Sequence, residues 1–313
     1  MTVMGINKIC SGHLIPELCW DWDSHHEISS IKPPELLMGV RKDLLQGDIY
    51  IEWFRWIIEQ FIEREYLHKA PSFPFVFESI YKEISALVGM QISDEQKISL
   101  SKHVSKLVID RVSLYHNKKS IRKAVSLETK LALLDIYGKK PRCWLTGYQF
   151  TKEAIFNFTE PKSEHLALKL PVYVDRLKPI GLNERDISIE IDHLHPFSQG
   201  GADDIGNYRL VCGWANKIKS DSITGYSTAQ KHICMDSYPS NGLYYWVLRL
   251  IGLRRKCEHP SCNKTIENNE LRVRSSLGKS KLINPLNMQV VCEDHDDLDD
   301  RFILSSKFND FTL

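Results

Sequence analysis

The chain has 313 residues, of which 42% are hydrophobic and 26% charged, a composition typical of a soluble globular protein with two or three domains. No run approaches the roughly 18 apolar residues of a membrane span, and the first ten residues lack the pattern of a secretory signal. We therefore expect a cytoplasmic protein without a membrane partner. In a reducing compartment its 8 cysteines favour metal binding over disulfides.

The N-terminal part of the chain is predicted to be helical. Residues 1–47 contain three prolines and only short periodic pieces, so we expect them to be irregular. Apolar residues at helical spacing predict four helices, over residues 48–69, 75–88, 93–116 and 127–137. Ser93 has the sequence context of an N-cap, and Gly138 is expected to end the fourth helix. Residues 1–140 are therefore predicted to form a helical domain.

The formal net charge of +1 hides a strong segregation of charge along the chain. Residues 115–142 carry eight basic against two acidic residues, and residues 249–281 carry nine against three, a net charge of +6 in each case. The last 21 residues carry seven acids against two bases, a net of −5. Each basic stretch could hold a polyanion or form an ordinary solvated face, and charge alone does not decide between them.

Residues 189–220 carry the most informative pattern in the chain. Alternating isoleucines predict a strand that ends at Asp192 and His193, and after a Gly-Gly turn a second β-type run opens at Asn207. A polar helix start with Asn216 follows. Two oxygen ligands (Asp192, Asn216), a histidine base and a bracing asparagine would then share one hairpin-plus-helix unit. Such a unit can hold one hard divalent cation beside a base, as phosphodiester hydrolysis requires.

This ordered set resembles the HNH endonuclease family, whose nuclease fold is a ββα-metal finger. His193 precedes Asn207 by 14 residues and Asn216 by 23, both usual for the motif, and the resemblance covers about residues 141–222. It implies that His193 is the general base, that Asp192 and Asn216 hold Mg²⁺ or another divalent cation, and that Asn207 ties the hairpin loop. Taken singly, each of these residues also fits an ordinary strand-end, turn or cap role.

Many members of this family hold the finger with two Cys-x-x-Cys pairs around a structural zinc, and here half of each pair is missing. Thr146 and Ala215 stand at the partner positions of Cys143 and Cys212. Because two thiolates make a poor zinc site, we expect both cysteines to be small buried residues in a finger held by packing.

Two further residues beside the motif leave alternatives open. His195 could be an accessory ligand or a packed or phosphate-facing histidine. Lys219, one helical turn after Asn216, could pair with a nucleic-acid phosphate or cover the helix surface.

A second metal site is predicted near the C-terminus. Its four soft or borderline ligands come in two close pairs, Cys257 with Cys262 and Cys292 with His295. They are separated by β-rich runs and followed by an expected helix over residues 296–304, an arrangement typical of zinc ribbons and treble clefs. Four protein ligands indicate a closed, structural Zn²⁺ site, in which His259 could replace one cysteine.

Together these features predict an α+β protein with three parts: a helical N-terminal domain (1–140), an HNH nuclease domain (141–235) and a C-terminal zinc-binding module (236–313). The function expected from the resemblance is Mg²⁺-dependent cleavage of DNA, in bacterial or phage restriction, defence or mobile-element biology. The motif does not distinguish DNA from RNA. The cations expected to contact nucleic acid are Lys219, Arg254, Arg255, Lys256, Arg272 and Arg274.

Two other functions fit the same sequence. One is a non-catalytic nucleic-acid-binding zinc protein that keeps the finger only as a fold. The other is a nuclease subunit that is silent until a partner activates it. The helical N-terminal domain would then provide the surface for a regulatory partner, or for a second copy of the chain.

Overall fold

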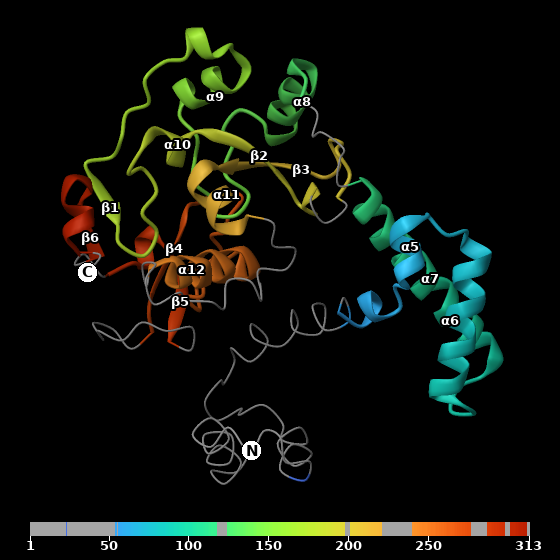
Figure 1. Ribbon diagram of the computed structural model, residues 1–313. Helices are drawn as coiled ribbons and strands as arrows, with labels where there is room; N and C mark the ends of the chain where they lie inside the picture. Colours follow the sequence, from blue (N-terminus) through green and yellow to red (C-terminus); the bar gives the residue numbers. More distant parts are fainter. Residues whose placement is uncertain are drawn as a thin grey trace.

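The computed structural model describes residues 56–117, 124–197, 201–220, 240–276, 287–297 and 301–311, together with residues 23 and 54. Within these ranges the protein combines helices with three small two-stranded antiparallel sheets (Figure 1). Among the described residues, the buried apolar side chains form three separate clusters. The α+β class predicted from the sequence is therefore confirmed at this level of detail.

Three N-terminal helices share the first cluster: α5 (Arg64–His68), α6 (Phe73–Val88) and α7 (Asp94–Asn117). Figure 1 shows them side by side, apart from the sheets. The cap expected at Ser93 is present as a reciprocal pair, because Gln96 N donates to Ser93 Oγ and Ser93 N donates to the Gln96 side chain.

The single helix expected over residues 48–69 is wrong in its described part. Residues 56–60 are helical, the backbone leaves the helix at 61–63, and α5 starts a separate helix. Ile58 and Tyr66, on either side of the break, are both buried in the same cluster. Tertiary packing thus takes precedence over a continuous helical period. Residues 48–53 and 55 of the prediction, and the expected irregular segment apart from residue 23, lie outside the described residues.

Helix α8 (Leu127–Tyr137) ends at Gly138, as the sequence predicts, and the φ of Gly138, 73°, is in the left-handed region. The side chain of Ser126 caps its start. Its buried Leu133 belongs to the central cluster rather than to that of α5–α7, and α8 packs on the next helix, α9 (Lys152–Thr159). The boundary at residue 140 stays a prediction, but the helix before it contributes to the central core.

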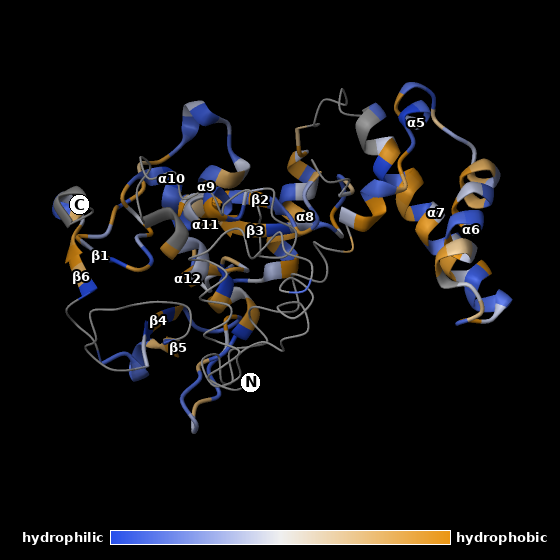
Figure 2. Cartoon of the chain, turned by 60° about the horizontal axis from the view of Figure 1, so that its bottom comes forward, coloured by the Kyte–Doolittle hydropathy of each residue, from blue (hydrophilic) through white to orange (hydrophobic). Residues whose placement is uncertain are grey.

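The central cluster is built around a β-hairpin and the helices that cover it. Strands β2 (Ile189–His193) and β3 (Tyr208–Cys212) pair, and so do β1 (Tyr173–Asp175) and β6 (Phe302–Leu304). The short helices α10 (Glu184–Ile187) and α11 (Gly213–Lys219) flank the hairpin. Figure 2 marks hydrophobic stretches on β3 and on α7, in keeping with their buried positions.

The C-terminal cluster lies between helix α12 (Ser240–Arg254) and the sheet formed by β4 (Leu271–Ser275) and β5 (Met288–Cys292). A 3₁₀ helix, Glu293–His295, follows β5. The α-helix expected over residues 296–304 is wrong, because residues 302–304 form β6 and pair with β1. Phe308, after β6, packs in the central cluster, so the end of the described chain returns to the central core.

Close backbone contacts join the C-terminal cluster to the central one. The N–H of Leu271 donates to Thr146 O (3.3 Å) and an Arg255 Nη donates to Trp144 O (3.4 Å). Gly147 has a φ of 72°, and a Cβ there would lie 2.2 Å from the carbonyl oxygen of Asn269. Only glycine fits this turn, because a side chain would push the two clusters apart. None of the described helices is long and apolar enough to span a membrane.

Candidate functional site

The hairpin and helix predicted from the sequence form one unit. In the antiparallel register of β2 and β3, Ile189 pairs with Cys212 and His193 with Tyr208, and α11 starts directly after Cys212. Gly213 is required at this junction, because a Cβ would lie 2.1 Å from the carbonyl oxygen of Arg185. The helix packs on both strands. Side chains of β2 and α11 are therefore held face to face.

Asp192 is buried at the end of β2, and both of its carboxylate oxygens are bonded. The Lys219 ammonium donates to Oδ1 (2.9 Å) and the Trp144 indole N–H donates to Oδ2 (3.2 Å). Lys219 also donates to the carbonyl oxygen of His193 (3.0 Å). Burial raises the pKa of Asp192, and Lys219 opposes that rise. A positive charge thus already lies against the carboxylate predicted to bind the cation.

His193 is buried on the other face of the strand end. Its Nε2 lies 2.9 Å from Oδ1 of Asp203, and the Tyr208 hydroxyl donates to the same oxygen at 2.6 Å. The rings of His193 and Tyr208 meet edge to face, with centroids 5.0 Å apart. Asp203 was not singled out by sequence reasoning, because an acid in a turn has no periodic signature.

The side chain of Asn207 is hydrogen-bonded to the loop between the strands. Its Oδ1 accepts from the N–H of His195, and its Nδ2 donates to the carbonyl oxygens of His195 and Ala202, each at 2.8 Å. Gly201 permits this close packing, since a Cβ there would lie 1.7 Å from His195 O. His195 itself lies beyond the end of β2 with an exposed side chain, so it does not share a strand face with His193.

Asn216 projects from α11 toward β2 and donates from Nδ2 to Oε2 of Glu190 (2.6 Å). The other oxygen of Glu190 accepts from Arg185 Nε (2.7 Å). Because a carboxylate only accepts hydrogen bonds, the amide nitrogen of Asn216 must face Glu190. The amide oxygen, the atom that a hard cation would bind, is therefore turned away from Glu190. Glu190, two residues before Asp192, is a second acid of the site that the sequence reasoning missed.

The donor set at this position fits a hard divalent cation. Asp192 and Asn216 supply oxygen atoms, with Glu190 beside them, and such ligands suit Mg²⁺. The ammonium of Lys219 supplies the positive charge that the buried carboxylate needs. A divalent cation at Oδ1 of Asp192 would have to displace it.

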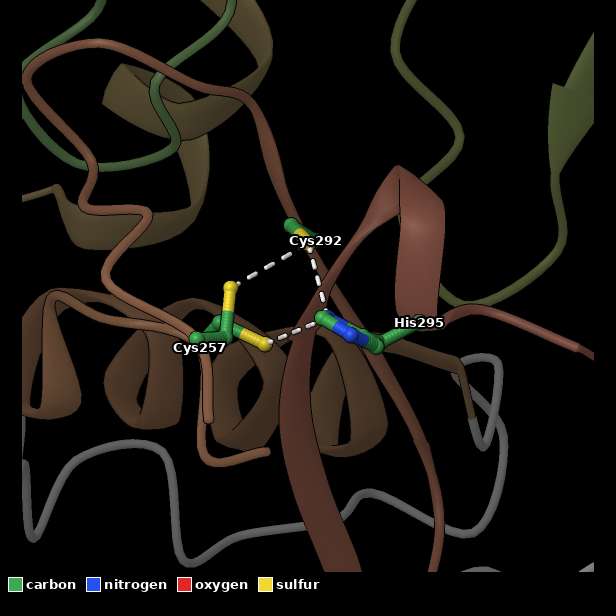
Figure 3. Close-up of side chains that lie close together, drawn as sticks. Cys257, Cys292 and His295 are labelled. Atoms are coloured by element: carbon green, nitrogen blue, oxygen red, sulfur yellow. Dashed lines mark hydrogen bonds between the residues drawn. The ribbon is translucent and has the colours of Figure 1, made fainter. Parts of the chain in front are cut away.

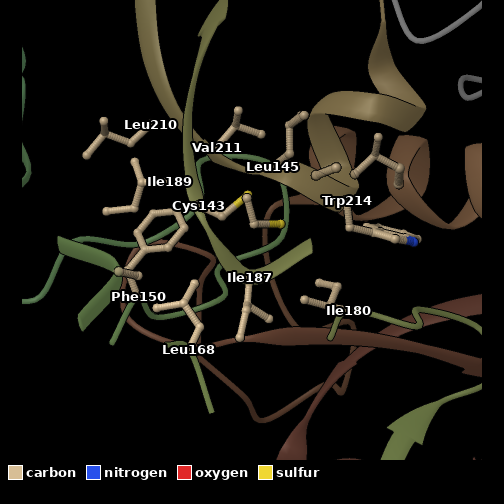
Figure 4. Packing of buried hydrophobic residues seen from close by; sticks show 14 of the residues in the cluster. Cys143, Leu145, Phe150, Leu168, Ile180, Ile187, Ile189, Leu210, Val211 and Trp214 are labelled. Carbon is tan, nitrogen blue, oxygen red and sulfur yellow. The ribbon is translucent and has the colours of Figure 1, made fainter. Parts of the chain in front are cut away.

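The positions of the missing zinc ligands are part of the core. Cys143 and Cys212 are 1% and 0% exposed, and Thr146 and Ala215, which replace the other two cysteines, are also fully buried. Figure 4 shows Cys143 among the aliphatic side chains of the central cluster. The expectation of small buried cysteines in a packed finger is confirmed.

The four ligands predicted near the C-terminus come together. One ligand atom from each of Cys257, Cys262, Cys292 and His295 lies within 4.8 Å of all the others. Figure 3 shows the thiols of Cys257 and Cys292 and the ring of His295 converging. Cys262 Sγ is 3.8 Å from Cys292 Sγ, and His295 Nδ1 is 3.3 and 3.6 Å from the sulfurs of Cys292 and Cys257.

The three separations between Cys262 and Cys292 and between His295 and the two sulfurs are compatible with a tetrahedral zinc site. With Zn–S bonds of about 2.3 Å, tetrahedral geometry places two thiolates about 3.8 Å apart. A hydrogen bond from the backbone N–H of Lys264 lowers the pKa of Cys262 and so favours the thiolate form that zinc binds. His259 is not in the group of four: its ring stacks on that of His295, with centroids 3.9 Å apart.

Most of the cations predicted to contact nucleic acid are paired with acids. Arg254 lies near Glu258 and Arg255 pairs with Glu267, while Lys219 is buried on Asp192. The other pairs use the acidic C-terminal residues, Arg272 with Glu293 and Asp296, and Arg274 with Asp297. Three of the acidic residues in the segment 293–297 thus lie against the basic residues of the C-terminal module. Lys256 is exposed.

Comparison with known proteins agrees with this motif. Residues 181–222, a segment that runs from before α10 to after α11, match the family model described as HNH endonuclease. The resemblance inferred from the sequence is therefore confirmed for that segment. No curated protein and no solved structure matches the chain.

Proposed function

We propose that the chain is a divalent-cation-dependent endonuclease that hydrolyses phosphodiester bonds in DNA. The observation that carries the proposal is the unit β2–β3–α11, in which Asp192, His193, Asn207 and Asn216 stand in the order and spacing of the motif. Cation ligands and a base on one rigid unit provide the pre-organised geometry that such hydrolysis needs.

In this proposal each residue has a separate task. Asp192 and Asn216 hold the cation, Mg²⁺ in the first instance, and a bound cation would stabilise the charge that develops on the phosphoryl and leaving oxygens. His193 takes the proton of the attacking water. Asn207 fixes the loop that follows His193. Lys219, once displaced from Asp192, becomes available to a phosphate.

The C-terminal module would contribute a structural zinc and a surface for the nucleic-acid backbone. Its Cys257, Cys262, Cys292 and His295 form the ligand group, and its arginines would exchange acidic partners for phosphates. The same proposal includes a cytoplasmic location and a role in restriction, defence or mobile elements. It also includes a homodimer or a protein partner bound through the N-terminal helices. RNA is the alternative substrate, because the motif does not distinguish it from DNA.

A nuclease that stays silent until it is activated is the second candidate, and one observation favours it. Both oxygens of Asp192 are occupied by donors of the chain itself, the ammonium of Lys219 and the indole of Trp144. A partner or substrate that draws Lys219 away would open the site to the cation. A non-catalytic binder would keep the same contacts without ever opening them.

Plasmid cleavage distinguishes these functions. Purified full-length protein is incubated with supercoiled plasmid and Mg²⁺, with and without EDTA, beside His193→Ala. Nicking or linearisation that needs Mg²⁺ and is lost in the variant supports the proposal. Asp192→Ala and Asn216→Ala should also abolish cleavage. Asn216→Ala should shift the melting temperature by only a few degrees, whereas Asp192→Ala leaves the buried Lys219 ammonium without its partner and should cost about 3–5 kcal/mol. Tight DNA binding without cleavage by either wild type or His193→Ala would indicate a binder or a silent subunit instead.

A further inference from the structure

We propose that Asp203 is the positioning residue of the general base: its carboxylate holds His193 in the tautomer that carries the lone pair on Nδ1. The inference rests on the proposed function for the role of His193 as a base, and on the geometry for the tautomer. Nε2 of His193 lies 2.9 Å from Oδ1 of Asp203, and the Tyr208 hydroxyl shares that oxygen at 2.6 Å.

The tautomer follows from the chemistry of the partners. An ionised carboxylate has no proton to give, so in this pair the imidazole must donate from Nε2. A neutral imidazole with its proton on Nε2 has its basic lone pair on Nδ1. Tyr208 reinforces the arrangement, because its hydroxyl donates to Asp203 and does not compete as an acceptor. The nitrogen that accepts the proton of water is thereby assigned to Nδ1.

The backbone of the sheet and of the loop holds His193, Tyr208 and Asp203 in place, in addition to the hydrogen bonds among the three side chains. His193 and Tyr208 are direct cross-strand partners, which sets the distance between their rings. Asp203 follows Ala202, whose carbonyl oxygen accepts from the Asn207 side chain. Asn207 therefore acts on the base by placing the loop residue that bonds to it. This gives the bracing asparagine of the motif a specific task in this chain.

The direct test is the ¹⁵N spectrum of the His193 ring in the full-length, metal-free protein, recorded at a pH high enough for the ring to be neutral. The wild type should show the proton on Nε2. Asp203→Asn should populate the other tautomer, because an amide can donate to Nε2. Asp204→Asn is the matched control: it makes the same charge change at an exposed neighbour and keeps an acceptor for the N–H of Asn207, so the wild-type tautomer should persist.

Kinetics gives the second readout. Asp203→Asn should lower kcat by about 100-fold or more, since an orienting carboxylate and the base it holds act together. The affinity for Mn²⁺ should stay within about twofold, because the cation ligands are untouched. Tyr208→Phe, which keeps the ring and removes the hydroxyl, should show a smaller loss in the same direction. It replaces Asp203→Asn as the test if that variant does not fold.

The outcomes separate this inference from the proposed function. A wild-type ring protonated on Nδ1, or an Asp203→Asn protein with unchanged tautomer and kcat, would overturn the role of Asp203 while leaving the nuclease intact. The opposite outcome is a wild-type protein that does not cut DNA but whose tautomer still depends on Asp203. That outcome would support the hydrogen bond between Asp203 and His193 and would refute the assignment of His193 as a base.

Discussion

Replacement of Lys219 by methionine tests how the chain holds the cation site when no divalent ion is bound. The ammonium lies 2.9 Å from Asp192 Oδ1 and 3.0 Å from the carbonyl oxygen of His193, and both side chains of the ion pair are buried. Methionine keeps an apolar stem of similar length but removes the charge. Of the two hydrogen bonds that the structure gives the Asp192 carboxylate, the one from the Trp144 indole would then remain.

The size of the effect follows from the geometry of the pair. At 2.9 Å and an effective dielectric constant of about 20, the attraction is about 6 kcal/mol, of which desolvation of the two charges offsets a part. Removing one partner of a buried ion pair typically costs about 3–5 kcal/mol. We therefore expect Lys219→Met to lower the free energy of unfolding by about 3–5 kcal/mol in the absence of divalent cations.

The loss should depend on pH. Burial raises the pKa of Asp192 and Lys219 opposes the rise, so the variant places the folded-state pKa further above the unfolded value of about 3.9. A carboxyl group with a raised folded-state pKa binds more protons when folded, so its stability is fully present at low pH and lost as the pH rises through that pKa. The destabilisation should be smaller at about pH 5 than at about pH 8.

Urea unfolding followed by circular dichroism, in EDTA and in Mn²⁺, measures both effects. Mn²⁺ should restore part of the stability of Lys219→Met and stabilise it more than the wild type, because the cation then compensates an unpaired carboxylate. Lys217→Met, an exposed lysine on the same helix, is the control. The role of Lys219 is refuted if both variants unfold within about 1 kcal/mol of each other, or if Mn²⁺ shifts the wild type and Lys219→Met equally.

Two further predictions concern the zinc group and the hairpin loop. Elemental analysis should find about one zinc per chain, lost in Cys292→Ser together with part of the thermal stability and kept in Cys143→Ser; zinc that follows Cys143 instead would place the metal in the central finger. Gly201→Ala should cost about 1–3 kcal/mol or more, because its Cβ would meet a backbone oxygen 1.7 Å away. Gly206→Ala, whose Cβ would meet only the Asp204 side chain, should cost less, and equal urea midpoints would contradict the steric clash expected at residue 201.

The parts of the structure that were predictable from sequence are those fixed by local chemistry. The capped start of α7 follows from Ser93 and the end of α8 from Gly138. The cap that Ser126 provides at the start of α8 is equally local, but the sequence reasoning did not single it out. The hairpin and the C-terminal ligand group follow from spacing, because strand alternation and paired ligands leave direct marks in the sequence. The break at residues 61–63 leaves no such mark, since it depends on which residues the neighbouring helices bury.

The sequence motif singles out candidate ligands for the site but not the residues that hold them in place. The motif singles out Asp192, His193 and Asn216, yet the residues that hold them in place act through tertiary contacts. Asp203 reaches His193 from a loop, and Glu190 reaches Asn216 across the gap between strand and helix. The sequence reasoning left Lys219 between a phosphate contact and a helix surface, whereas the structure buries it on Asp192. Each of these contacts needs two elements to be packed before it exists.

The central claim is that Asp192 and Asn216 hold a divalent cation beside His193. The most direct measurement is the anomalous diffraction of crystals soaked in Mn²⁺. We expect a peak between the carboxylate of Asp192 and the amide oxygen of Asn216, with the ammonium of Lys219 moved off Oδ1. Saturating Mn²⁺ with Lys219 still bonded to Asp192, and no peak at that position, would contradict the claim.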